Sequence, residues 1–196
     1  PVSVNKLGVD LLSLAGHKFY ATKGVGALYI RKGTALQPTL VGAGHERGLR
    51  PGTENVPAIT GMGEAARLAV ERNPEEIQHL SGLRDELHAR LAETIPELEL
   101  NGHPEQRLPN TLNLSFPAID GRDLLVLASD QVAASVGSAC HEDGEAVSGV
   151  LGAMGIIAEQ ARGAVRLSLG TPTTDEEIGR AAKALVSAWQ EGTKQR

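Results

Sequence analysis

The chain has 196 residues, of which 41% are hydrophobic and 22% are charged, and its net charge is -5. This composition is typical of a globular protein and argues against nucleic-acid binding as the main function. The single cysteine excludes an internal disulfide and favours a reducing, cytoplasmic compartment, and no apolar run approaches the roughly 20 residues of a membrane span.

The first third of the chain is predicted to contain two short strands and a long loop. Residues 9–14 (VDLLSL) and 25–31 (VGALYIR) are apolar runs typical of buried strands, joined by a tight connection. Residues 36–58 are rich in glycine, proline, threonine and arginine and show no period. Long irregular loops inside compact domains tend to carry function.

From residue 60 onward, helical patterns alternate with strand patterns, which predicts an α/β or α+β fold. The pattern in 62–72 is helical, and Asn73-Pro74-Glu75-Glu76 is typical of the start of a second helix. A capping box beginning at Thr174 predicts the start of the last helix. The remaining expected elements are strands at 111–116, 132–137 and 164–170 and helices at 121–130 and 150–156.

A domain boundary is expected near residues 60–73. The segment before it is too short to cover its own strands, so it is expected to be the tail of a larger domain.

Lys18, in the segment GHKFY, directly follows the first predicted strand. A lysine at the mouth of a sheet beside an apolar wall can have a lowered pKa and act as an amine nucleophile, as a Schiff base with pyridoxal phosphate (PLP) requires. The alternative is a solvated lysine in a turn.

The segment GAGHERGLRPGTEN, residues 42–55, offers Arg47, Arg50, Thr53 and a glycine-rich backbone. Guanidinium groups, a hydroxyl and free backbone N–H groups suit a phosphate or a carboxylate. A flexible surface loop with unpaired arginines would show the same pattern.

Cys140 lies in SVGSACHEDG, a small-residue segment with His141 next to it. Such a setting leaves a thiol accessible, and a nearby positive charge lowers a thiol pKa. The alternative is an inert small residue in a loop. A metal site is not expected, because no other cysteine or paired histidine lies at ligand spacing.

Arg166 interrupts the alternating apolar strand AVRLSLG and is predicted to lie on the face opposite Val165 and Leu167. It is either a ligand for a carboxylate or an ordinary outward-facing charge.

Taken together, four segments resemble the C-terminal half of a group I cysteine desulfurase. They are VDLLSLAGHKFYATKGVGALYIRKG, GAGHERGLRPGTENVPAITGMGEA, SVGSACHEDG and VRLSLGTPTTDEEI, in this order, and the resemblance covers essentially the whole chain. That family belongs to the class V aminotransferases among the fold-type I PLP enzymes, and selenocysteine lyase is a relative. The fold implied is α/β: residues 1–66 as the C-terminal remnant of the PLP-binding large domain, and 67–196 as a small α+β domain carrying the cysteine loop.

The resemblance also implies roles for particular residues. Lys18 would hold PLP as a Schiff base, with His17 and Gly16 near its phosphate. Thr53 would reach the phosphate in the partner subunit of a homodimer. Arg166 would bind the substrate carboxylate, and Cys140 would take the sulfur of L-cysteine as a persulfide. An iron–sulfur scaffold or a thiolation protein would then accept that sulfur, without a nucleic acid or a membrane.

Because the resemblance is to half of an enzyme, the isolated chain is expected to be a fragment or one half of a split enzyme, with weak PLP binding and poor turnover. Two other functions stay open: selenocysteine lyase, and a non-catalytic fragment that relays sulfur on Cys140 or binds a partner.

Overall fold

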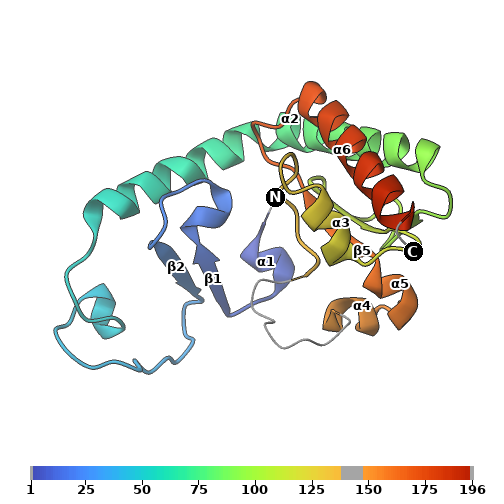
Figure 1. The fold of residues 1–196 in the computed structure, drawn as a ribbon. Helices are drawn as coiled ribbons and strands as arrows, with labels where there is room; N and C mark the ends of the chain where they lie inside the picture. The colour runs from blue at the N-terminus through green and yellow to red at the C-terminus, as the bar shows by residue number, and fades with distance from the viewer. Residues whose placement is uncertain (1, 138–147, 195–196) are drawn as a thin grey trace. The chain divides into compact units, whose positions relative to one another are not determined.

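The structure, a computed structural model, describes residues 2–137 and 148–194. The chain divides into two compact units, Pro1–Pro74 (unit 1) and Glu75–Arg196 (unit 2). Figure 1 shows the chain coloured from the N-terminus to the C-terminus.

Unit 1 contains an antiparallel pair of strands, β1 (Leu11–Ala15) and β2 (Gly26–Ile30), preceded by a short helix α1 (Val4–Leu7). The 3₁₀ helix η1 (Gly16–Phe19) forms the connection directly after β1. Both strands and their tight connection are confirmed, but the expectation that these strands are buried was wrong, because no residue of β1 or β2 is buried in the described structure. Among the described residues of unit 1, only Gly16 is buried, so this two-stranded sheet has no core of its own.

The long loop after β2 contains a short left-handed turn, η2 (Glu46–Gly48), and it ends where α2 (Val56–Thr94) begins. The prediction of two helices in this region, one over 62–72 and one starting at Asn73, was wrong. A single helix runs through Pro74, which lies inside it. Proline removes one backbone hydrogen bond from a helix, and the loss is tolerated here because the carbonyl it would have bonded belongs to the exposed Val70.

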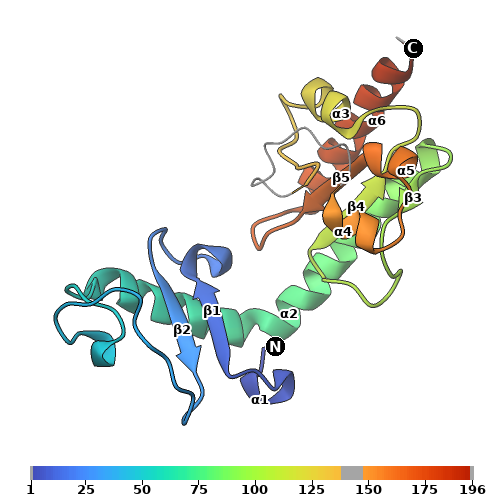
Figure 2. The ribbon, with the colours of Figure 1, turned by 90° about the horizontal axis from the view of Figure 1, so that it is seen from below.

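Unit 2 contains a three-stranded antiparallel sheet in the order β3 (Glu99–Leu100), β4 (Thr111–Ser115) and β5 (Ala164–Ser168). Figure 2 shows β4 and β5 side by side within this unit. β4 and β5 confirm their predictions, while β3 was not anticipated. The strand expected at 132–137 is reduced to a single bridge, between Ser135 and Arg166.

The described residues of unit 2 also form the helices α3 (Gly121–Leu127), α4 (Gly149–Ala153), α5 (Ala158–Arg162) and α6 (Asp175–Lys194). Helix α6 begins as predicted: the Thr174 hydroxyl accepts from the Glu177 amide and the Glu177 carboxylate accepts from the Thr174 amide. Helix α5 was not predicted, because five residues are too few to display a helical period.

One apolar cluster joins the C-terminal part of α2 to β4, β5, α3 and α6. Its most deeply buried members are Leu91, Ile95, Leu112, Leu114, Leu124, Val165 and Leu185. Trp189 packs against this cluster, and its indole N–H donates to the Pro117 carbonyl at 2.9 Å. No helix of the described chain is long and apolar enough to cross a membrane.

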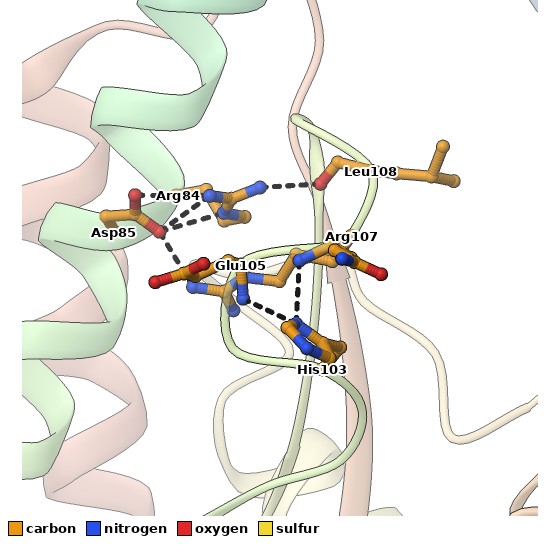
Figure 3. A network of polar contacts seen from close by, with 7 residues as sticks. Arg84, Asp85, His103, Glu105, Arg107 and Leu108 are labelled. Carbon is orange, nitrogen blue, oxygen red and sulfur yellow. Dashed lines mark hydrogen bonds and ion pairs between the residues drawn. The ribbon is translucent and has the colours of Figure 1, made fainter.

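Two arginines share one carboxylate at the edge of this core (Figure 3). Arg84 of α2 is buried; it donates to both oxygens of Asp85 and, at 2.7 Å, to the Leu108 carbonyl. Arg107 donates to Asp85 through Nη2 at 2.8 Å. The Nε and Nη1 atoms of Arg107 are buried without a hydrogen-bond partner among the described residues. Arg84 therefore ties the 101–110 loop to α2, whereas Arg107 adds a poorly satisfied charge.

This asymmetry predicts opposite effects of two matched substitutions. Arg107→Met removes the unpaired N–H groups and is expected to raise the free energy of unfolding by about 1 kcal/mol. Arg84→Met leaves the Leu108 carbonyl without its charged donor and leaves Asp85 with Arg107 alone, and it is expected to lower the free energy of unfolding by about 2 kcal/mol. Urea unfolding of the two variants would measure both changes, and a loss of stability in Arg107→Met would contradict the assignment.

His88, on the next turn of α2, predicts a pH dependence. Burial, and then the charge of Arg107, holds the pKa of His88 below its ordinary value of 6.5. The unfolded chain therefore binds a proton here more readily than the folded chain does. The free energy of unfolding is expected to fall as the pH drops below 6.5, and His88→Gln should reduce this fall. Unfolding curves above and below that pH would test both statements.

Candidate functional site

The turn that carries Lys18 is held in place by Gly16. The Gly16 amide donates to the Val25 carbonyl at 2.9 Å, and the Gly16 carbonyl accepts from the Ala21 amide at 3.1 Å. A Cβ atom at Gly16 would lie 2.9 Å from both the carbonyl oxygen and a methyl carbon of Val25. Only glycine therefore fits where the chain leaves β1 and turns back toward β2.

His17 and Lys18 follow in η1, and both are exposed. The Lys18 side chain makes no hydrogen bond or ion pair with any residue that the structure describes. A primary amine without a protein partner, presented at the end of a strand, is chemically suited to condense with an aldehyde. The structure thus brings Gly16, His17 and Lys18 together in a single turn.

Thr53 lies in the long loop of the same unit, three residues before α2 begins. It is exposed, and its hydroxyl has no partner in the described part of the chain. Arg50, which the sequence offered as an anion ligand, donates instead to the backbone carbonyls of Gly52 at 3.0 Å and Thr53 at 3.5 Å. Arg50 shapes the loop, and Thr53 has the free hydroxyl.

Arg166 lies in β5 of unit 2. Its neighbours Val165 and Leu167 are buried, and Arg166 itself is exposed, as the alternation predicted. Along one edge of β5, Arg166 is in register with Asn113 of β4. Along the other edge, Arg166 and Ser135 exchange two backbone hydrogen bonds, of 2.7 and 3.2 Å.

Cys140 and His141 lie outside the described residues. Before them the structure describes the chain up to Gly137, whose amide donates to the Ser135 hydroxyl at 3.2 Å. Sequence reasoning missed Ser135, because a serine in a small-residue segment carries no signal of its own. Its pairing with Arg166 joins residues 31 apart in the chain.

A cavity of about 530 Å³ lies in unit 2, lined mainly by residues 130–133, the end of β5 and the start of α6. None of the predicted site residues that the structure describes lines it. In the described ranges, no group of three or more histidine, cysteine, aspartate or glutamate side chains could hold a metal ion.

The model of the family described as aminotransferase class-V matches residues 1–180. The chain belongs to the class V aminotransferase family. Among curated proteins it is similar to "Cysteine desulfurase IscS" of Methanosarcina thermophila, with 48% identity over 92% of this chain and 45% of that protein. It is also similar to "Cysteine desulfurase IscS 1" of Archaeoglobus fulgidus, with 44% identity over 94% of this chain and 48% of that protein.

Solved structures give the same result. A protein described as NifS-like has 39% identity and a TM-score of 0.85, over 95% of this chain and 48% of that one. A NifS-like protein from Rickettsia africae has 28% identity and a TM-score of 0.85, over 97% of this chain and 50% of that one. The chain spans about half the length of the curated relatives it matches.

The crowding around Gly16 predicts the effect of one added methyl group. Gly16→Ala is expected to destabilise the β1–β2 pair by roughly 1–3 kcal/mol, because its Cβ would collide with backbone. Gly61→Ala, inside α2 with open space around it, is the matched control and should not weaken this pair. Amide hydrogen exchange in β1 and β2 would measure the difference, and equal protection in both variants would refute the expectation.

Proposed function

We propose that this chain contributes the C-terminal half of a PLP-dependent cysteine desulfurase. The enzyme would remove sulfur from L-cysteine, giving L-alanine and a persulfide on Cys140. The similarity to two proteins named cysteine desulfurase, at 44% and 48% identity over more than nine tenths of the chain, supports this activity. One solved structure with 30% identity and a TM-score of 0.60 is described as SspA in complex with cysteine, which supports the substrate.

The observation that carries the proposal is the double hydrogen bond between Ser135 and Arg166. These backbone bonds join the strand that carries Arg166 to Ser135, which precedes Cys140 by five residues in the sequence. A site that binds a substrate carboxylate and attacks the same substrate's sulfur needs these two segments near one another. Guanidinium also pairs with a carboxylate through two parallel hydrogen bonds, which lysine cannot reproduce.

The cofactor fits the residues of unit 1. Lys18 supplies a free amine for the aldehyde of PLP, and the free hydroxyl of Thr53 is a donor for a phosphate, in the partner subunit of the proposed homodimer. His17 and Gly16 lie in the same turn as Lys18, and we assign these two residues to the neighbourhood of the PLP phosphate. PLP, when bound, withdraws electrons from the substrate and so weakens bonds at its carbons.

Three residues of this chain have separate roles in the proposed reaction. Arg166 binds the substrate carboxylate and orients the molecule. The Lys18 amine moves protons at the substrate carbons. The Cys140 thiolate attacks the substrate sulfur: a sulfur–sulfur bond forms as the carbon–sulfur bond breaks, and the carbon keeps the electron pair and is protonated to alanine. The outer sulfur of the persulfide passes to an acceptor protein.

The exposed apolar side chains of the β1–β2 sheet indicate that unit 1 packs against further protein in the complete enzyme. Leu11, Leu14 and Leu28 of its sheet are each more than two fifths exposed, although leucine is among the residue types most often buried. The exposed leucines support residues 1–66 being part of a larger domain; residues 67–196 would then form the small domain. Assembly as a homodimer, residence in the cytoplasm and sulfur transfer to an iron–sulfur scaffold or thiolation protein belong to the same proposal.

Two substitutions in the complete enzyme test this function. Lys18→Ala should abolish the absorbance band of the PLP–lysine linkage and lower alanine formation from L-cysteine by roughly a hundredfold or more. Cys140→Ser should keep the band and lose sulfur release. A Cys140→Ser enzyme that releases sulfur at the normal rate would overturn the role of Cys140. Turnover of L-selenocysteine without turnover of L-cysteine would point to a selenocysteine lyase.

A further inference from the structure

The loop that carries Thr53 is closed on itself at two places. Gly42 and Pro51 approach so closely that a Cβ atom on Gly42 would lie 2.7 Å from the Pro51 Cβ. The His45 ring nitrogen Nδ1 lies 3.0 Å from Oε2 of Glu54, and both side chains are half-buried. The segment between His45 and Glu54 is therefore a ring of residues held by one side-chain contact at its ends.

The backbone inside this ring is in a costly conformation. Glu46 and Arg47 have φ values of 48° and 59°, in the left-handed region that side chains disfavour, and Gly48 continues the run at 82°. Such residues persist only where the surrounding contacts hold them in place. The contact between His45 and Glu54 is immediately next to Glu46 at one end of the ring.

At the other end of the ring, hydrogen bonds hold Glu54 and the backbone of Thr53, whereas the Thr53 hydroxyl stays free of described protein partners. The pKa of Glu54 is lowered, first by hydrogen bonding to its own backbone amide and then by the hydrogen bond from His45. Arg50 fixes the carbonyls of Gly52 and Thr53. Thr53, directly before Glu54, is thus fixed through its backbone while its hydroxyl bonds to no described protein group.

We infer that His45 and Glu54 form a clasp that positions Thr53 to bind the phosphate of PLP. They are positioning residues: neither is needed to touch the cofactor. This inference rests on the proposed function, since it assumes that Thr53 is a phosphate ligand. It assigns a purpose to a histidine–glutamate pair that the proposed reaction does not use.

The decisive experiment compares PLP with pyridoxal, which lacks the phosphate, in the complete enzyme. In His45→Ala the dissociation constant for PLP should rise roughly tenfold, as is common when a partner that orients a ligand is removed. The dissociation constant for pyridoxal should not change. His45→Gln, whose amide can still donate to Glu54, should restore PLP affinity. The double variant His45→Ala/Glu54→Ala should be no weaker than His45→Ala, because both remove the same contact.

Two controls test whether the effect belongs to the clasp itself. Glu64→Ala breaks an exposed ion pair with Arg67 on α2 in the same unit and should leave PLP affinity unchanged. Carbon-13 NMR of the Glu54 carboxyl group needs no cofactor: its pKa should rise toward the ordinary value in His45→Ala and stay low in Glu64→Ala.

Thr53→Val distinguishes failure of the clasp from failure of the proposed function. If Thr53→Val leaves PLP affinity unchanged, Thr53 is not a phosphate ligand, and both the proposed role and the clasp fall. If Thr53→Val weakens PLP binding and His45→Ala does not, only the clasp is wrong. Equal loss of PLP and pyridoxal binding in His45→Ala would mean general destabilisation and would also overturn it.

Discussion

Unit 2 depends on strand β5 being bonded along both edges. β4 pairs with one edge and Ser135 with the other, while Val165 and Leu167 anchor one face in the apolar core. A slip of one residue would turn those two side chains outward and Arg166 inward, which the core does not allow. The outward direction of Arg166 is therefore enforced by the burial of its neighbours, and the pairing with Ser135 follows from the same register.

Elements with a strong local pattern could be predicted from the sequence. β1, β2, β4 and β5 are short runs whose apolar residues match a strand, and the capping box at Thr174 is complete within four residues. The region around Pro74 could not be predicted in the same way. Asn73 and Pro74 have the composition of a helix start, yet a helix that already exists on both sides can absorb one missing hydrogen bond.

Side-chain contacts between residues far apart in the chain could not be predicted from the sequence. Arg107 stands in a polar loop that looks solvated, and its contact with Asp85 spans 22 residues. The Arg50 guanidinium was a candidate anion ligand, but it faces its own backbone, and no composition rule separates these outcomes. The structure explains why residue 16 is a glycine and shows that the Lys18 amine has no partner among the described residues. The roles of Lys18, Thr53, Arg166 and Cys140 in catalysis stay predictions.

The placement of the aromatic side chains has an optical consequence. Trp189 is the only tryptophan and belongs to unit 2, where its indole N–H bonds to Pro117. Both tyrosines, Tyr20 and Tyr29, belong to unit 1. Emission excited selectively from the indole therefore reports on unit 2 alone, and the phenol signal reports on unit 1. One unlabelled sample can thus reveal whether the two units melt together or separately.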